Sequence, residues 1–561
     1  TQMITRLRCH RVFLFSLLSA RSFAPATSTR SNCESTDLKM TPWKAYDESQ
    51  EDDARKLEIW PLDEYNVKLL NEVHPRDYVQ STPAPHEVYD LIAIGAGAGG
   101  LVSSKQTARR GGKSAMISAH LAGGDCLNVG CVPSKALLRA MKAIREVKRS
   151  AEFGINLGGS EPTIDFSTIM KRLREKRSVI SPADGHTGTT SVGTHVFQGR
   201  GRFTGRNTIE VNGVTLNFRK AVVATGGRPT IPNYPGLKDA PYTTNELLFN
   251  LEELPPRMLV LGSGVIALEM AQSFASFGSS VTVIQRSDRL FKSKFGDEEA
   301  AELLQKLLGE DGVNFLSKTT VKQVETLRDR SVDTLPLMKV TLDVDGEERD
   351  LECECLLVAT GRASNVEDLG LEAAGVEYKL GKGVTINDYA QSVGNEDVYA
   401  VGDCAAGVPR LTHMSGEMAK QVVQNALFGD SWKLSDYVVP AVMYTEPEYA
   451  TVGIASLDQA VSEGVEVDVY RGGLEHNDRA ILESDNHGFV KVICEKGTDK
   501  ILGATIVASR AGEIINEVTL AMKHGIGLGG IGRNIHAYPT TGEALMGAGL
   551  QFINSRWKRL D

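Results

Sequence analysis

The sequence predicts an α/β fold in which one Rossmann-like dinucleotide-binding domain is inserted in another, followed by a C-terminal α+β domain. Two glycine-rich turns, each between an apolar strand and a helix, predict the two Rossmann-like units. Short apolar strands without such a turn follow residue 435 and predict the third domain. A length of 561 residues agrees with several domains rather than one.

The first glycine turn lies in VYDLIAIGAGAGGLVSSKQTARRGGKSAMIS, residues 88–118, which reads as strand, turn, helix and strand. Its glycines Gly95, Gly97 and Gly100 have the G-x-G-x-x-G spacing. The first permits the tight turn, the second lets the backbone approach a pyrophosphate, and the third lets the helix pack on the strand. The phosphate is then expected at the N-terminus of the helix, where free N–H groups point at it.

The second glycine turn lies in RMLVLGSGVIALEMAQSFASFGSSVTVIQR, residues 257–286. Gly262 and Gly264 hold the first two positions, and Ala267 takes the third. Two such units in one chain predict two bound dinucleotides.

Strands that end in a Thr-Gly turn lie on both sides of the second unit. AVVATGGRP precedes it and carries Thr225 and Gly226, while CLLVATGRASN follows it and carries Gly361. NEDVYAVGDCA then places Asp403 at a strand end. This order predicts a first domain at 88–240 and 357–434, interrupted by a second domain at 241–356.

The pattern changes in the last part of the chain, residues 435–561. PAVMYTEPEYATVGIAS, GFVKVICEK and KILGATIVA read as antiparallel strands, and AGEIINEVTLAMKHG reads as a helix. These elements predict an α+β domain with its own core.

The composition is that of an ordinary globular protein, with 41% hydrophobic and 24% charged residues. A formal net charge of −9 gives no electrostatic attraction to nucleic acid, so we expect no such partner. Eight cysteines are too few for a disulfide scaffold. Cys353 and Cys355 lie in LECECLLVATG, which reads as one strand that points both to the same face; we expect ordinary thiols there and no metal site.

The first residues, 1–45, resemble a targeting leader. RLRCHR is basic, VFLFSLLSA is an apolar run too short for a bilayer span, and RSFAPATSTRSN is rich in Ser, Thr and Arg. The junction SARSFAP resembles the bipartite plastid-targeting signals of algae; a mitochondrial or secretory leader is the alternative. Residues 46–87 are polar and acidic and read as a linker, in which LDEYNVKLLNEVHP could form a short docking helix. No other segment has the length of a membrane span, so we expect no membrane partner.

The strongest chemical motif is GGDCLNVGCVPSKALL, in which Cys126 and Cys131 lie on a segment that runs from a loop into a helix. This spacing can bring the two sulfurs within disulfide reach. A position at a helix N-terminus lowers the pKa of a thiol and favours the thiolate that redox exchange needs. The pair is therefore predicted to be redox-active.

With these motifs in order, the chain from about residue 88 to 548 resembles the class I pyridine nucleotide-disulfide oxidoreductases. That family includes dihydrolipoamide dehydrogenase, glutathione reductase and mercuric reductase. The resemblance implies a homodimer in which electrons run from NAD(P)H to FAD and then to the cysteine disulfide. It implies that Cys131 is the sulfur on the flavin side and Cys126 the sulfur that meets the acceptor, with a Lys135–Glu269 ion pair at the flavin edge.

The resemblance also assigns the cofactor sites. For FAD it implies Gly95, Gly97, Gly100, Lys135, Thr225, Gly226 and Asp403, and for NAD(P)H it implies Gly262, Gly264, Glu269, Gln285, Arg286 and Gly361.

Two positions depart from the family pattern at the nucleotides. Ser118 stands where an acid normally holds the adenosine ribose of FAD, so that affinity is expected to be lower or supported elsewhere. Gln285 stands where members that prefer NADH carry an acid, with Arg286 and Arg289 close behind. Losing the acid removes repulsion of a 2′-phosphate and arginine can pair with it, which favours NADPH and leaves NADH as the alternative.

A third departure concerns the acceptor. Disulfide reductases carry His-Pro near the C-terminus, where this chain has Tyr538-Pro539, with Glu543 five residues after the tyrosine. A histidine shuttles protons at neutral pH and a tyrosine does not do so comparably; His536 is the nearby substitute. Mercuric reductases have tyrosine at this position, but the chain ends in GLQFINSRWKRLD without their vicinal cysteines and shows no N-terminal C-x-x-C domain. Dedicated Hg(II) detoxification is therefore not expected.

The sequence thus predicts an NAD(P)H-dependent FAD oxidoreductase of the mercuric reductase-like branch, acting on a small-molecule or thiol/disulfide acceptor. Dihydrolipoamide dehydrogenase or glutathione reductase activity is the alternative, which Tyr538 disfavours. A flavin-binding redox sensor with little turnover is the alternative from another class.

Overall fold

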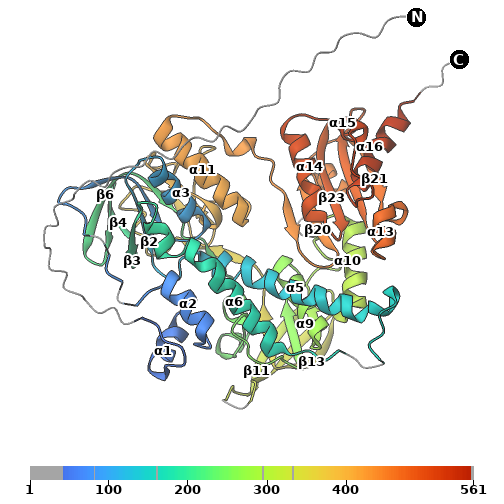
Figure 1. Cartoon of the computed structure of the whole chain (residues 1–561), viewed down its shortest axis with the longest axis horizontal. Helices are drawn as coiled ribbons and strands as arrows, with labels where there is room; N and C mark the ends of the chain where they lie inside the picture. The colour runs from blue at the N-terminus through green and yellow to red at the C-terminus, as the bar shows by residue number, and fades with distance from the viewer. Residues whose placement is uncertain are drawn as a thin grey trace, which may run out of the picture. The chain divides into compact units, whose positions relative to one another are not determined.

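The structure is a computed structural model of the chain and describes residues 42–76, 78–80, 82–158, 162–292, 296–331 and 334–557 (Figure 1). Apart from its last four residues, the expected targeting leader at 1–45 lies outside the described residues, so it stays a prediction.

The first dinucleotide-binding domain is built on a seven-stranded sheet with the order β3-β2-β1-β6-β5-β4, in which β18 also pairs with β6. Strands β1, β2, β3, β6 and β18 pair in parallel, while β4 and β5 pair antiparallel beside β6. Because β18 comes from the far side of the second unit, the two parts of this domain share one sheet, as the sequence predicted. The strands are β1 (Val88–Ile94), β2 (Ser114–Ser118), β3 (His195–Gln198), β4 (Arg202–Gly205), β5 (Thr208–Val211), β6 (Val214–Val223) and β18 (Val398–Ala400).

Helix α3 (Ala98–Arg109) follows the first glycine turn and packs against α11 (Thr412–Phe428) beside this sheet (Figure 1). Two small antiparallel ribbons complete the domain, β7 (Gly227–Pro229) with β15 (Arg362–Ser364) and β16 (Tyr378–Lys379) with β17 (Gly383–Val384).

The inserted domain contains a four-stranded parallel sheet with the order β10-β9-β8-β14 and a three-stranded antiparallel sheet with the order β11-β12-β13. Its elements are β8 (Arg257–Leu261), α9 (Val265–Phe277), β9 (Ser280–Ile284), α10 (Glu298–Glu310), β10 (Val313–Leu316), β11 (Thr319–Arg328), β12 (Leu337–Val344), β13 (Glu347–Cys353) and β14 (Cys355–Val358). Strand β14 ends two residues beyond the expected boundary at 356.

The expectation that Cys353 and Cys355 share one strand is wrong. The chain leaves the antiparallel sheet after Cys353 and enters the parallel sheet at Cys355. Both thiols are buried, but in different hydrophobic clusters, because Glu354 turns toward Arg257 and breaks the strand. Among the described residues no group of three or more metal-binding side chains is present.

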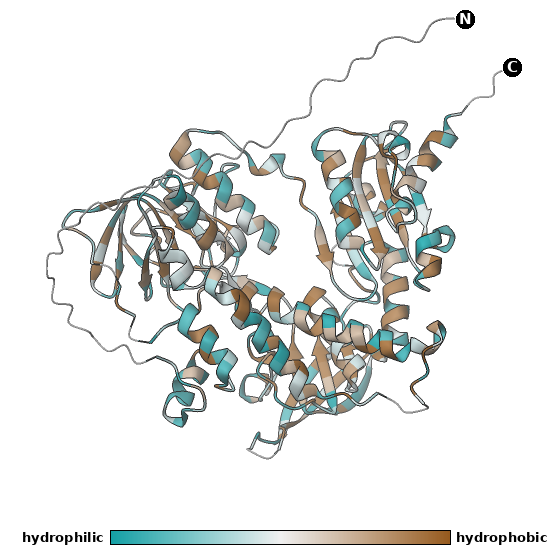
Figure 2. Cartoon of the chain, viewed as in Figure 1, coloured by the Kyte–Doolittle hydropathy of each residue, from teal (hydrophilic) through white to brown (hydrophobic). Residues whose placement is uncertain are grey.

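The C-terminal domain is a five-stranded antiparallel sheet with the order β19-β20-β23-β22-β21, as the sequence predicted. Figure 2 shows its central strands in brown, in agreement with their burial in one apolar cluster. The elements are β19 (Ala441–Met443), β20 (Glu448–Gly453), α12 (Leu457–Ser462), β21 (Val467–Gly473), α13 (Asp478–Leu482), β22 (Phe489–Glu495), β23 (Ile501–Ala508), α14 (Ala511–Lys523), α15 (Leu528–Arg533) and α16 (Glu543–Ser555).

Residues 46–87 are only in part the linker that their charge suggested. Helices α1 (Glu48–Lys56) and α2 (Glu64–Val73) form there, and α2 packs on α6 (Phe166–Asp184) (Figure 1). The expected docking helix is therefore present. The linker prediction gave weight to the acidic residues, of which the described ones apart from the buried Asp63 are at least partly exposed, whereas a smaller set of apolar side chains is buried in one cluster. These are Trp43, Ala54, Ile59, Leu62, Leu69, Leu70 and Val73.

Among the described residues, none of the helices combines the length and the apolar character needed to cross a bilayer.

Candidate active site

Cys126 and Cys131 lie on two consecutive helices that meet at a tight corner. Cys126 is in α4 (Gly124–Asn128), and Cys131 is the first residue of α5 (Cys131–Lys148). The corner requires glycine at position 130, because a Cβ there would lie 2.7 Å from the Asp125 carbonyl oxygen. The sequence therefore folds so that both sulfurs are half-buried and within hydrogen-bond reach of each other.

The two sulfurs share a hydrogen bond and respond to it in opposite ways. The Cys126 thiol donates to Cys131, which lowers the pKa of Cys131 to about 6, and it raises the pKa of Cys126 far above its usual range. Burial raises both pKa values, while the Thr412 hydroxyl, 3.3 Å from the Cys131 sulfur, and the Lys135 ammonium add to the lowering at Cys131. The pair therefore carries one proton near neutral pH, on Cys126, with Cys131 as the thiolate.

The expected ion pair of Lys135 and Glu269 is formed. The Lys135 ammonium lies 2.9 and 2.8 Å from the two carboxylate oxygens of Glu269, and only 2% of the Glu269 side chain is exposed. The backbone N–H of Tyr444 donates to the same carboxylate at 2.9 Å, and the Tyr444 ring lies 4.6 Å from the ammonium. Helices α5 and α9 are thereby joined beside the thiolate.

The first glycine turn fits a dinucleotide phosphate. A Cβ at Gly95 would lie 2.2 Å from the Ala224 carbonyl oxygen, and Gly95 has a φ of +112°, so the turn requires glycine. A Cβ at Gly97 would meet only the Gly124 Cα, at 3.8 Å, which leaves the N-terminus of α3 open to a ligand. A Cβ at Gly100 would lie 1.8 Å from the Gly95 carbonyl oxygen, as close helix packing demands.

The structure brings Thr225, Gly226 and Asp403 together beside the same turn. The Thr225 hydroxyl donates to the Asn365 carbonyl at 2.6 Å, and the N–H of Asn365 donates to the Gly226 carbonyl at 3.0 Å. Asp403 is mostly buried, and burial raises its pKa although Arg362 donates to it at 3.3 Å. A buried carboxylate with one charged partner keeps acceptor capacity for a ligand hydroxyl, as the FAD assignment requires.

Arg362 links this group to the redox loop, because its guanidinium also bonds the carboxylate of Asp125, the residue before Cys126. Neither Asp125 nor Arg362 was expected from the sequence.

The second glycine turn is also open to a phosphate. Gly262 has a φ of +109°, and a Cβ at Gly264 would meet no atom within 4 Å at the N-terminus of α9. Gly361, with a φ of +145°, lies between β14 of this domain and β15 of the first domain. These residues fit a second dinucleotide, as the sequence predicted.

The three side chains expected near a 2′-phosphate differ in whether other residues already bind them. Gln285, 2% exposed, donates to the Ser317 hydroxyl at 2.8 Å, while its Oε1 has no partner among the described residues. Arg289 is occupied by Asp458 at 3.0 Å and by the Gly296 carbonyl. Arg286 is exposed and pairs with no acid in the described part of the chain. Arg286 alone is therefore free for a phosphate.

Ser118 ends β2 with its side chain 1% exposed, and its hydroxyl donates to the His120 carbonyl at 3.1 Å. At the position where the family carries an acid, this chain therefore has a hydroxyl that already donates its hydrogen bond to a backbone carbonyl.

Tyr538 and Glu543 lie in the C-terminal domain of the same chain. Tyr538 is 72% exposed and donates to Asp478 at 2.8 Å, which together with Glu543 raises its pKa. Glu543 accepts from the Thr540 N–H at 2.9 Å and so holds the loop that precedes α16. His536 lies 3.2 Å from Glu517. The contacts of all three side chains are within their own domain, and none of them touches the cysteine pair of this chain.

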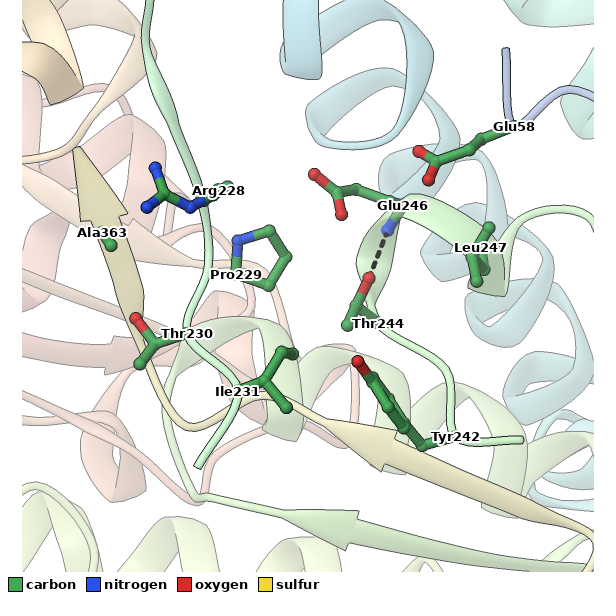
Figure 3. Close-up of a pocket in the computed structure, with 10 residues that line it drawn as sticks. All are labelled: Glu58, Arg228, Pro229, Thr230, Ile231, Tyr242, Thr244, Glu246, Leu247 and Ala363. Carbon is green, nitrogen blue, oxygen red and sulfur yellow. Dashed lines mark hydrogen bonds between the residues drawn. The ribbon is translucent and has the colours of Figure 1, made fainter. Parts of the chain in front are cut away.

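A cavity of 520 Å³ lies beside the β7 strand (Figure 3). Its carboxylates are Glu58, from the N-terminal segment, and Glu246, whose pKa burial and the nearby Glu58 raise to about 7. Figure 3 shows both carboxylates directed into the space between Arg228 and the helix that carries Glu246. The N-terminal segment, the described residues from 42 to 87, therefore lines this cavity and packs on the rest of the fold.

Sequence reasoning missed several residues that surround the pair. Thr412 lies 281 positions from Cys131 and begins α11, so no local spacing signals it. Tyr444 touches Glu269 through its backbone, which any residue type could provide.

Comparisons with known proteins agree with this geometry. Residues 89–419 match the family model described as pyridine nucleotide-disulphide oxidoreductase, and residues 439–548 match the model of its dimerisation domain. A mercuric reductase from Lysinibacillus sphaericus is 33% identical over 518 residues, 92% of this chain and 89% of the relative. A dihydrolipoyl dehydrogenase from Staphylococcus aureus is 34% identical over 466 residues, 82% of this chain and 95% of the relative.

A solved structure shows the same fold. The Cu(II) complex of the HOCl-induced flavoprotein disulfide reductase RclA from Escherichia coli aligns with a TM-score of 0.72 at 23% identity, and covers 83% of this chain and 99% of that one.

Proposed function

The chain belongs to the pyridine nucleotide-disulphide oxidoreductase family, and from this premise we propose that it oxidises NADPH and reduces a small disulfide or thiol-bound metal acceptor. Members of this family are FAD-dependent oxidoreductases with NAD(P)H as the electron donor. The observation that carries the proposal is the adjacent pair of Cys126 and Cys131 beside the Lys135–Glu269 ion pair, in which the hydrogen bond from Cys126 lowers the pKa of Cys131.

The glycine turn around Gly95, with Thr225 and Asp403, would hold FAD, which when bound would supply from NADPH the two electrons that open the Cys126–Cys131 disulfide. With an acceptor disulfide, the proton of Cys126 passes to Cys131 along their shared hydrogen bond, and the Cys126 thiolate attacks one acceptor sulfur and displaces the other, which takes the proton back from Cys131. The Cys131 thiolate attacks Cys126 in the mixed disulfide and releases the second acceptor sulfur as thiolate. The two electrons of the dithiol have then passed to the acceptor, and the Cys126–Cys131 bond is restored.

Tyr538 supports the mercuric reductase-like branch. We propose that the chain works as a homodimer in which the loop of Tyr538 meets the cysteine pair of a second copy, since its own hydroxyl is exposed and turned to its own domain. A phenol with a raised pKa holds its proton near neutral pH, so it serves as a hydrogen-bond donor to a leaving sulfur and not as a base.

The acceptor is tested by steady-state NADPH oxidation against Hg(II), lipoamide, oxidised glutathione, quinones and dyes. We expect glutathione and lipoamide to be poor acceptors of the wild type, and Tyr538→His to improve them about tenfold by supplying a proton shuttle. Activity with quinones or dyes alone would contradict the proposal that Cys126 meets the acceptor. If Tyr538→His reduces glutathione and lipoamide no faster than the wild type, this position does not limit disulfide reduction.

The nucleotide preference is proposed from Gln285 and Arg286. Gln285→Glu should raise KM for NADPH about tenfold and leave KM for NADH nearly unchanged, because a carboxylate repels the 2′-phosphate. Arg286→Ala should raise KM for NADPH by a similar factor, while Arg289→Ala serves as the matched control since Asp458 already occupies that guanidinium. If Arg286→Ala raises KM for NADH as much as KM for NADPH, Arg286 does not bind the 2′-phosphate.

We also propose a plastid location, which rests on the leader motif SARSFAP alone. A fluorescent fusion of residues 1–45 expressed in an alga tests it, and import into mitochondria would contradict it.

A further inference from the structure

A completely buried arginine lies between the N-terminal segment and the redox loop. Arg177 is on α6 with 0% of its surface exposed. One terminal nitrogen of its guanidinium donates to the carbonyl oxygen of Asn128 at 2.7 Å. The other terminal nitrogen donates to the side-chain oxygen of Asn66 at 2.8 Å. Asn128 ends α4 and lies between Cys126 and Cys131, so the arginine joins helix α2 directly to the corner of the redox loop.

The burial of this cation needs a reason, because an isolated buried charge is costly. No carboxylate contacts the Arg177 guanidinium in the described part of the chain, and its partners are two neutral oxygens. Burial, with the neighbouring Arg174, lowers the pKa of Arg177 to about 10, which leaves it charged at neutral pH. A cation whose contacts are a helix-terminal carbonyl and an amide oxygen contributes by fixing those two groups in place.

The same segment holds the redox loop at other points. The N–H of Ala122, just before the loop, donates to the carbonyl oxygen of Val73 at 2.9 Å. Leu127, next to Cys126, is 1% exposed and packs in the cluster to which the N-terminal segment contributes half of the buried residues. Asn128 also donates through its side chain to the carbonyl oxygens of Ala122 and Gly124, both at 2.9 Å. The redox loop is therefore held at Ala122 and Leu127 as well as at Asn128.

We propose that Arg177, anchored by Asn66, is a positioning residue that holds Cys126 in bonding geometry with Cys131, which makes the N-terminal segment part of the redox site. The inference rests on the proposed function, in which this pair cycles between dithiol and disulfide. A disulfide forms only when its Cα atoms lie within a narrow range, so a loop that is free to drift favours the dithiol.

The experiment measures the disulfide equilibrium of the full-chain, FAD-loaded enzyme in buffers of reduced and oxidised dithiothreitol, with thiol alkylation and mass spectrometry as the readout. Arg177→Met and Asn66→Ala should lower the equilibrium constant for the Cys126–Cys131 disulfide about tenfold, a rise of about 30 mV in midpoint potential. FAD content should stay at the wild-type level.

Arg174→Met is the matched control. Arg174 lies on the same helix and pairs with Asp63 of the same segment at 2.6 Å, but has no contact with the redox loop. Arg174→Met should lower Tm about as much as Arg177→Met does. It should leave the midpoint potential within about 10 mV of the wild type, which corresponds to a change of roughly twofold in the equilibrium constant. Asn66→Asp loses the hydrogen bond from the side-chain amide to the Pro61 carbonyl but keeps an oxygen that accepts from Arg177. Its midpoint potential should therefore equal that of the wild type, unlike that of Asn66→Ala.

An unchanged potential in both Arg177→Met and Asn66→Ala, or an equal shift in Arg174→Met, would overturn the proposal. If Arg177→Met does not fold, Asn66→Ala against Asn66→Asp decides the question alone. Dithiothreitol replaces NADPH here, so a wild-type pair that NADPH cannot reduce would refute the proposed function without affecting this comparison.

Discussion

Replacement of Cys131 by serine is expected to lower NADPH-dependent reduction of any disulfide acceptor by about 10³-fold or more, since the pair acts as one unit. A serine hydroxyl in place of the thiolate can neither accept electrons from the flavin side nor release the acceptor from Cys126. Binding of FAD should be unchanged, because the glycine turn, Thr225 and Asp403 are separate from the sulfur. Stopped-flow and steady-state NADPH oxidation check this result.

Cys126→Ser and Cys494→Ala complete the test. Cys126→Ser should lose acceptor turnover to the same extent but keep a Cys131 thiolate, whereas Cys494 is buried in the C-terminal domain and should be dispensable. Acceptor reduction that survives in Cys131→Ser would mean that electrons leave the flavin by another route.

The lowered pKa of Cys131 fixes the sign of its pH dependence. The thiolate is the reactive form, so alkylation of the reduced enzyme at Cys131 should rise with pH through about 6 and level off above it. An ordinary thiol would instead rise through about 8.5. In the same experiment Cys126, whose pKa is raised, should stay slow throughout the range.

Replacement of Lys135 by methionine is expected to have the second-largest effect. It leaves the buried Glu269 carboxylate with the Tyr444 N–H as its remaining donor in the described structure. Removing one partner of a buried pair costs about 3–5 kcal/mol, and we expect the lower end because 38% of the Lys135 side chain is exposed. Chemical denaturation measures the loss.

The same substitution should also raise the pKa of Cys131, since the ammonium lowers it in the wild type. Lys142→Met is the matched control on the same helix, where Lys142 pairs with Glu446 at 2.7 Å. It should lower stability without moving the pH profile of Cys131 alkylation. A profile unchanged in Lys135→Met would refute the electrostatic role of the ion pair.

The parts of the site that local patterns determine were predictable from the sequence. The strand, glycine turn and helix around Gly95 and Gly262 form as expected because each depends on backbone geometry within one short segment. The Lys135–Glu269 pair was expected from the family resemblance, and the structure shows Glu269 buried on the apolar helix α9.

The rest depended on contacts distant in sequence. The N-terminal segment looked like a linker because its charges outnumber its apolar residues, yet Leu69, Leu70 and Val73 bury one face of α2. Arg177 looks like one of several basic residues on α6, and only packing of α2 turns it inward. The break between Cys353 and Cys355 was invisible because both cysteines lie in strands, at the end of β13 and at the start of β14, with a single residue between them.

The central claim is that electrons from NADPH reach the Cys126–Cys131 pair, and anaerobic titration of the full-chain holoenzyme with NADPH tests it most directly. Absorbance and quenched alkylation are followed together. We expect the first two electrons to convert the disulfide to two alkylatable thiols, with a long-wavelength band from the Cys131 thiolate against the flavin that is absent in Cys131→Ser. A flavin that bleaches with the first two electrons while Cys126 and Cys131 remain a disulfide would contradict it.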